Sequence, residues 1–283
     1  MDFAEVRRLT IVALFSDDKL WEQLVLKGGN ALNLVYGLSP RTSLDLDFSI
    51  EEDFADLADT RRRVLQAVKA RFSDAGFVVF DDTFEPKPRV RGPNQAAWWG
   101  GYQLVFKLIE EAKHKALSGN IESIRRNALV VGPAQQRNFS VDMSKHEYCH
   151  GKLARALDHY SIHVYSLDMI VIEKLRALCQ QMTQYPLRSK PSPRARDFYD
   201  IYRVLTEAKI DLSTPGNIEL ATHIFAAKEV PLSLLARVSE TREFHRPDWP
   251  AVVNAVGERL EDFDFYFDFV IRQIAALKAL WVE

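Results

Sequence analysis

Two acidic residues that share one face of an expected strand offer the clearest chemistry in the chain. Asp45 and Asp47 lie in the segment 44–50, where apolar and polar residues alternate. Side chains two residues apart on a strand point the same way and lie about 6–7 Å apart. A cation relieves the repulsion between such carboxylates, and Mg²⁺ or Mn²⁺ suits the position because it combines carboxylate oxygens with water and phosphates. The spacing indicates metal-assisted phosphoryl transfer, although acids so spaced more often form a solvated strand face.

A pair of glycines provides the second part of the candidate site. Gly28 and Gly29 follow the apolar run 24–27 and precede a helical pattern. Their backbone can approach a phosphate closely, and the helix that follows offers free N–H donors. A glycine pair alone is more often a plain tight turn. Together with the two acids, and with Arg41 and Ser43 just before them, the pair indicates a nucleotide-binding site.

A lysine within an apolar stripe is the third candidate. Lys174 belongs to the apolar face of an expected helix, 166–182, which Ser166 would cap. An unpaired buried ammonium is costly, so it must reach solvent or meet an anion. Two interpretations remain open: Lys174 pairs with Glu173 or Asp168 or reaches solvent, or it holds triphosphate oxygens as a point charge.

Acids and bases around a later helix, 195–208, add further candidates. An acid in a first helical turn, such as Asp197, is ordinarily explained by the helix dipole. For Asp200 we expect surface pairs with Arg203 and Arg196. Four cations without an acid between them could contact acceptor phosphates or form a solvated loop: Arg188, Lys190, Arg194 and Arg196.

The elements that must position these residues change character along the chain. Before residue 165 we expect helices at 3–15, 17–23, 30–36 and 54–73. The same part should contain strands at 24–27, 44–50, 77–80, 102–107, 138–143 and 162–165. Beyond it we expect only helices, at 166–182, 195–208, 217–228, 231–239, 248–257 and 260–281. The pattern predicts a sheet-containing α/β part followed by an all-helical part.

Composition limits the classes of function. The chain has 283 residues, 47% hydrophobic residues and a formal net charge of −2, which excludes a broadly cationic polyanion binder. No apolar run reaches the roughly 20 residues that span a bilayer, so we expect a cytoplasmic protein with no membrane partner. Two cysteines are too few for a disulfide framework.

Three stretches resemble one known family. The stretch KGGNALNLVYGLSPRTSLDLDF (27–48) is similar to the first motif of the AbiEii-type nucleotidyltransferase toxins, a branch of the polymerase-beta-like nucleotidyltransferase superfamily. SLDMIVIEKLRAL (166–178) and RARDFYDIYRVL (194–205) resemble that family's lysine-bearing and final aspartate-bearing motifs, in the same order. The resemblance extends from about residue 20 to 205, and the C-terminal helices are not matched residue by residue.

The resemblance implies a fold and a set of roles. The fold would combine an N-terminal nucleotidyltransferase-like lobe with a small mixed sheet, 1–165, and an all-helical lobe, 166–283, that completes the nucleotide and acceptor site. Asp142 stands where related transferases often carry a third carboxylate that helps activate the acceptor hydroxyl, and it would be a third metal ligand. A lone Asp at a strand end more often makes local hydrogen bonds. The remaining catalytic residues would be Asp45, Asp47, Lys174 and Asp197, with Gly28, Gly29, Arg41 and Ser43 at the nucleotide.

The implied activity is transfer of a nucleoside monophosphate from an NTP to a hydroxyl with Mg²⁺ or Mn²⁺. The family indicates the 3′ end of tRNA as acceptor, growth arrest as outcome and a cognate antitoxin as partner. Transfer to a small molecule or a protein side chain is an alternative. A catalytically silent nucleotide-binding module is another, although intact Asp45, Asp47, Lys174 and Asp197 argue against it.

Overall fold

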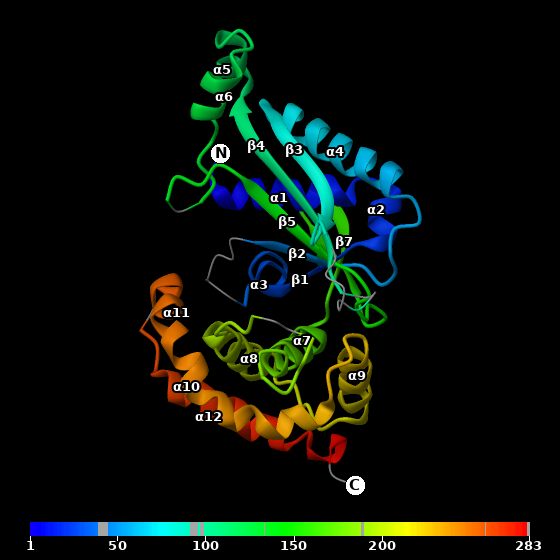
Figure 1. Ribbon diagram of the computed structural model, residues 1–283, viewed down its shortest axis with the longest axis vertical. Helices are drawn as coiled ribbons and strands as arrows, with labels where there is room; N and C mark the ends of the chain where they lie inside the picture. Colours follow the sequence, from blue (N-terminus) through cyan, green and yellow to red (C-terminus); the bar gives the residue numbers. More distant parts are fainter. Residues whose placement is uncertain are drawn as a thin grey trace.

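A mixed sheet of seven strands forms the centre of the described chain. The computed structural model describes residues 1–38, 45–90, 96, 99–132, 134–187, 190–257 and 259–281. The strand order is β3-β4-β5-β2-β1-β7-β6 (Figure 1). The strands are β1 (Val25–Lys27), β2 (Leu46–Ser49), β3 (Phe77–Lys87), β4 (Gly101–Glu110), β5 (Phe139–Ser144), β6 (Leu153–Leu157) and β7 (Tyr160–Val164).

The register of the central strands aligns three charged residues. β2 runs antiparallel to β1, with Asp47 opposite Lys27, and parallel to β5, with Asp47 opposite Asp142. β1 also pairs in parallel with β7. Because residues opposite each other on adjacent strands point to the same face, the sheet itself gathers these side chains. The strand expected at 44–50 therefore lies where the chemistry requires it.

The edges of the sheet differ most from expectation. The strands expected at 77–80 and 102–107 are parts of a longer antiparallel hairpin, β3 and β4, with an irregular register between Phe80 and Thr83. The sequence pattern does not predict strand β6. Its middle residues are exposed, so the apolar alternation that reveals a half-buried strand is missing.

Helices cover the sheet on the side shown behind it in Figure 1. Contacts of α1 with α4 and β7, and of α4 with β3, hold this layer together. The helices before residue 165 are α1 (Phe3–Phe15), α2 (Asp18–Gln23), α3 (Gly28–Asn30), a π-helix (Ala31–Val35), α4 (Leu57–Asp74), α5 (Glu111–Ala116) and α6 (Ile121–Arg126). The sequence pattern does not predict the last two, since they are short and largely exposed.

Every described element after Tyr165 is helical. The α-helices are α7 (Leu167–Cys179), α8 (Ala195–Ala208), α9 (Pro215–Ala226), α10 (Arg242–His245), α11 (Trp249–Val256) and α12 (Phe263–Ala275). The same part contains 3₁₀ helices at Leu232–Thr241 and Arg246–Asp248, and another at Lys278–Leu280 follows α12. Ser166 caps α7 by accepting a hydrogen bond from the Met169 amide, as its sequence position predicts.

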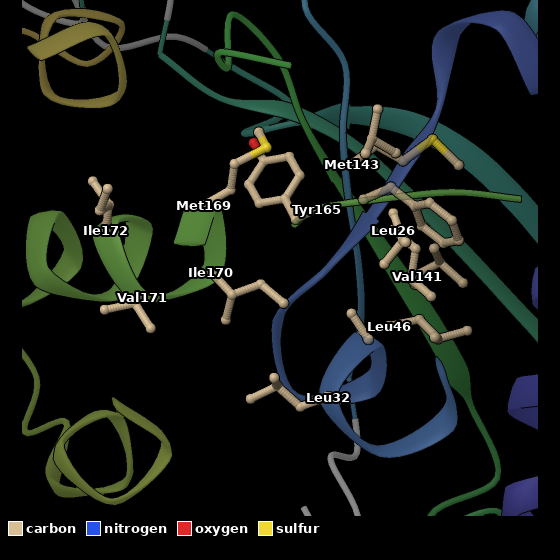
Figure 2. Packing of buried hydrophobic residues seen from close by; sticks show 14 of the residues in the cluster. Leu26, Leu32, Leu46, Val141, Met143, Tyr165, Met169, Ile170, Val171 and Ile172 are labelled. Carbon is tan, nitrogen blue, oxygen red and sulfur yellow. The ribbon is translucent and has the colours of Figure 1, made fainter. Parts of the chain in front are cut away.

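The helical part joins the sheet through α7. Figure 2 shows Met169 and Ile170 on this helix and Leu26 and Leu46 on the central strands, all within one buried cluster. Burying apolar side chains from both parts stabilises their contact by about 25 cal/mol per Å² of apolar surface. The position of Lys174 relative to β1 and β2 is therefore fixed by packing. No helix among the described residues is long and apolar enough to cross a membrane.

Candidate active site

The bend after β1 requires glycine at its first position. Gly28 has a φ of +70°, in the left-handed region. A Cβ built on it would lie 3.3 Å from Oδ2 of Asp47, which is tighter than ordinary contact. The following turn continues as α3 and the π-helix, so N–H groups near Gly28 and Gly29 begin a helical segment. The glycine thus allows the backbone to approach the acid on β2.

Alanine substitutions should separate backbone strain from this close approach. Gly37 also has a positive φ, +65°, and a Cβ added there would have no described atom within 4 Å. We expect Gly28→Ala and Gly37→Ala each to lower the free energy of unfolding by about 1–2 kcal/mol. Only Gly28→Ala should also lower nucleotidyl transfer, because only there does the methyl group press on Asp47. Urea denaturation and a transfer assay check both effects, and equal activity losses would contradict the assignment.

Asp45 and Asp47 line one cavity together with the glycine bend. This cavity measures about 210 Å³. The sheet side contributes Lys27, Gly28, Gly29, Asp45, Asp47 and Ser144, and the helical side contributes Glu173, Lys174, Arg194, Arg196 and Asp197. Asp47 also lines a larger neighbouring cavity of about 410 Å³. We call the two the glycine cavity and the large cavity. The pair of acids therefore faces the same space, as the alternation in the sequence predicts.

The surroundings of the Asp47 carboxyl favour its protonated form. Its pKa is raised to about 6, mainly by burial and also by the carboxylates of Asp142 and Asp45. Lys27 opposes this shift. An added positive charge at this position would favour the ionised form of Asp47.

Asp142 lies on β5 beside Asp47 and faces the large cavity. Its two carboxylate oxygens accept hydrogen bonds from Nζ of Lys87 at 2.9 and 2.8 Å. Nε2 of Gln103 donates a further hydrogen bond of 3.0 Å. The strand expected at 138–143 is thus confirmed, and its acid is brought next to the pair on β2. These contacts hold the carboxylate toward the cavity that Asp47 shares.

Lys174 pairs with two carboxylates, and neither of them lies on its own helix. Its ammonium donates hydrogen bonds of 2.8 Å to both Asp197 and Asp200, and the lysine is only 5% exposed. Burial alone would lower the pKa of Lys174, but these carboxylates raise it. The interpretation that paired Lys174 with Glu173 or Asp168 is wrong, because the partners come from α8.

Asp197 and Asp200 are both buried on the face of α8 that packs against α7. The expectation of a surface position for Asp200 is therefore wrong: it is 1% exposed. Asp197 occupies the first turn of α8, as expected. Its carboxylate also accepts hydrogen bonds from Arg194 and Lys174. Burial alone would raise the pKa of Asp197, yet Arg194 and Lys174 hold it far below its ordinary value.

The expected basic cluster is divided by the structure. Arg194 lines both cavities, and Arg196 lines the glycine cavity. Lys190 is exposed and lines none of the cavities described here. Arg41, Ser43 and Arg188 lie outside the described residues, so the structure does not test their expected contacts.

A family model decides the class of protein. The model of the nucleotidyl transferase AbiEii toxin, Type IV toxin–antitoxin system, matches residues 10–269. The chain belongs to the AbiEii nucleotidyltransferase toxin family. It is therefore a nucleotidyltransferase of a toxin–antitoxin system, for which the family implies an NTP substrate and an antitoxin partner. No curated protein matches the chain.

Two solved structures resemble this AbiEii chain. The nucleotidyltransferase toxin MenT4 from Mycobacterium tuberculosis H37Rv is 15% identical with a TM-score of 0.48; the match covers 97% of this chain and 82% of that one. An antigenic nucleotidyltransferase-like protein from Paracoccidioides brasiliensis is 15% identical with a TM-score of 0.37, covering 88% and 93%.

Sequence reasoning missed a residue that positions Asp45 in the AbiEii site. The side chain of Asn30 donates a hydrogen bond of 2.5 Å to the backbone oxygen of Asp45. The side-chain oxygen of Asn30 accepts a hydrogen bond from Arg7 of α1, and both residues are almost fully buried. The bridge links the helix after the glycine bend to the start of β2. Only the asparagine's place directly after Gly28-Gly29 could have drawn attention to it.

The donor set of the AbiEii site fits a hard divalent cation. Mg²⁺ is typically bound by one or two carboxylates and completes its octahedron with water and substrate phosphates. Asp45 and Asp47 supply such a pair on one cavity wall, and burial together with the neighbouring carboxylates raises the pKa of Asp47 despite the nearby Lys27. Among the described residues, no three His, Cys, Asp or Glu side chains form a ready-made metal cluster. The pair therefore suits an ion that arrives with a nucleotide.

Proposed function

We propose that this chain transfers a nucleoside monophosphate from an NTP to an acceptor hydroxyl, with Asp45 and Asp47 as the ligands of Mg²⁺ or Mn²⁺. The observation that carries the proposal is the shared glycine cavity, where these acids face the bend at Gly28 and the cations Lys174 and Arg196. When bound, the metal would neutralise phosphate charge and lower the pKa of an attacking hydroxyl. It would also offset the repulsion between the triphosphate and the carboxylates of Asp45 and Asp47.

The side chains around the cavity have complementary roles. N–H groups at Gly28 and Gly29 contact phosphate oxygens, as helix N-termini do. Lys174 uses two of its three N–H donors on Asp197 and Asp200, which leaves the third for the triphosphate. Asp197 is a positioning residue, since its contacts with Lys174 and Arg194 fix where those charges lie.

The transfer step can be written with these groups. The acceptor oxygen forms a bond to the α-phosphorus, the bond from that phosphorus to the bridging oxygen of the β-phosphate breaks, and pyrophosphate leaves. The hydroxyl proton passes to the carboxylate of Asp142, which lines the large cavity on the other side of Asp47. Asp142 thus serves as a general base, and it would be a third ligand of the metal when that is bound.

We propose the 3′ end of tRNA as the acceptor, with block of translation and growth arrest as the outcome inside the cell. The family membership supports a toxin role, and Arg194 and Arg196 add cations beside the site. We also propose that residues 1–165 form the catalytic lobe and 166–283 a helical lobe that completes the site. Lys174, Asp197 and Arg194 come from the second part, which supports this division.

One assay tests the proposal. The purified protein is incubated with each α-³²P-labelled NTP, total tRNA and Mg²⁺ or EDTA, beside Asp45→Asn and the surface control Asp74→Asn. We expect label on tRNA with the wild type and the control only, and none with EDTA. Label on the protein itself or on a small molecule would favour those acceptors instead. Absence of any transfer with all four NTPs would support a silent nucleotide-binding module.

A further inference from the structure

A third cavity continues the large cavity away from the glycine bend. It measures about 230 Å³ and lies at the end of the β3–β4 hairpin. Lys87, Trp99 and Tyr102 line both this cavity and the large one, so the two are adjacent. Neither the family motifs nor the proposed nucleotide site uses this part of the molecule. A ligand bound there would lie beside Asp142 and beyond it.

The charges of this third cavity favour an anion. Its carboxylate, Asp53, accepts hydrogen bonds from Lys145 and from the hydroxyl of Tyr102. Lys145 is 5% exposed and is engaged by that carboxylate. Two exposed cations also line the wall: Lys87, whose ammonium pairs with Asp142, and Arg89. Beside them lies the partly buried indole of Trp99.

The in-line geometry of phosphoryl transfer indicates from which side the acceptor hydroxyl approaches the phosphorus. In transfer at phosphorus, the attacking and leaving oxygens lie roughly in line on opposite sides of the phosphorus. If pyrophosphate leaves at the glycine cavity, the hydroxyl must arrive from the opposite side. Asp47 lines both spaces, whereas Asp142 lines only the large cavity of the two. The acceptor therefore extends past Asp142 toward Lys87, Arg89 and Trp99.

We propose that Lys87, Arg89 and Trp99 form an acceptor groove for the 3′ end of a single-stranded nucleic acid; this rests on the proposed function. A base stacks on Trp99 and backbone phosphates bind Lys87 and Arg89, the combination that non-specific single-strand binders use. An acidic peptide would satisfy the cations but offers no flat face to the indole. Nucleic acid is thus the class of acceptor that the groove fits.

The groove also links acceptor binding to the base. Lys87 donates to both oxygens of Asp142 at 2.9 and 2.8 Å, and its side chain is 52% exposed. A phosphate in the groove competes for the same ammonium. When Lys87 turns to that phosphate, the carboxylate of Asp142 is released to receive the proton of the acceptor hydroxyl. The ion pair thereby keeps Asp142 occupied until an acceptor arrives.

Binding of a labelled RNA tests the groove separately from catalysis. A 3′-hydroxyl, 5′-fluorescein RNA of twelve nucleotides is titrated with full-length wild type, Lys87→Gln/Arg89→Gln, Trp99→Ala and Trp99→Phe at several KCl concentrations. We expect the double variant to raise Kd at least about tenfold and to reduce the salt slope of log K by about 1.4, or about 0.7 per lost phosphate contact. Trp99→Phe should retain most of the affinity that Trp99→Ala loses.

Two exposed cations at the other end of β4 provide the matched control. Lys113→Gln/Arg126→Gln on α5 and α6 should leave Kd and salt slope unchanged, because these residues lie far from Gly101 along the hairpin (Figure 1). In steady-state transfer, the Lys87 and Arg89 variant should raise KM for the nucleic acid and not for NTP.

The outcomes separate the groove from the proposed function. Wild-type affinity and salt slope in the double variant would overturn the groove. Equal losses in the control variant would overturn it as well, because they show a diffuse charge effect. If RNA binds in the groove as expected but no NTP labels it, the groove stands and the proposed transfer to nucleic acid fails.

Discussion

Replacing Asp47 with Asn should reduce nucleotidyl transfer on the order of 10³-fold or more, the largest activity loss we expect in this chain. The amide keeps the shape of the side chain and removes its charge. Asp47 lines both cavities, as Glu173 does, and its carboxylate lies beside the glycine bend. Loss of its charge therefore affects both the triphosphate side and the acceptor side. The measurement is kcat with saturating NTP and Mg²⁺, with Asp74→Asn as control.

The same substitution should make the metal-free protein more stable. The pKa of Asp47 is about 6 in the folded protein and 3.8 in the reference state. Between these values the folded state binds more protons, so the free energy of unfolding falls as pH rises through this interval. The free-energy cost of ionising Asp47 in the folded protein is fully present above pH 6. Asp47→Asn removes that charge and should therefore raise the free energy of unfolding at pH 7.5 on the order of 2 kcal/mol.

Mg²⁺ provides the control for this interpretation. A ligand that binds only the folded state stabilises it by RT ln(1 + [L]/Kd). Mg²⁺ with a non-hydrolysable NTP should therefore raise the Tm of the wild type and leave the Tm of Asp47→Asn nearly unchanged. A variant that retains transfer within tenfold of wild type, or that is less stable than wild type in EDTA, would show that Asp47 does not hold the metal.

The sequence predicts the local parts of this site well. Alternation in 44–50 correctly predicts that Asp45 and Asp47 face one space, and helical periodicity places Ser166 as a cap and α8 at residues 195–208. Each of these features depends on residues close in the chain. The resemblance adds membership of the AbiEii family, which the family model confirms over residues 10–269.

The parts that sequence reasoning missed depend on contacts between distant segments. Lys174 meets Asp197 and Asp200, 23 and 26 residues further along, because α7 packs against α8. Helical spacing alone favours partners on the lysine's own helix, so it predicts Glu173 or Asp168. Asn30 escapes notice for the same reason, since its partner, Arg7, comes from α1.

Glu147 should be the carboxylate whose removal destabilises the fold most. It is 5% exposed and lies 3.0 Å from Nη1 of Arg176, 3.3 Å from Nζ of Lys27 and 3.5 Å from Nζ of Lys228. Burial alone would raise its pKa, but these three cations hold that pKa far below its ordinary value. The carboxylate of Glu147 thus pairs with cations from β1, from α7 and from the segment after α9.

Glu147→Gln leaves these buried cations without that charge, and breaking a buried ion pair costs about 3–5 kcal/mol. We expect a loss of this size in urea denaturation at pH 7.5, against less than about 0.5 kcal/mol for the exposed control Glu122→Gln. Adding Lys228→Met to Glu147→Gln should recover part of the loss, because it removes one of the uncompensated charges.

Since Lys27 lies opposite Asp47 in the sheet, Glu147→Gln should also lower nucleotidyl transfer. A loss below about 1 kcal/mol would mean that water or neighbouring acids, Glu173 first, already balance the cluster, and that packing of α7 on β1 alone holds the two halves of the site together.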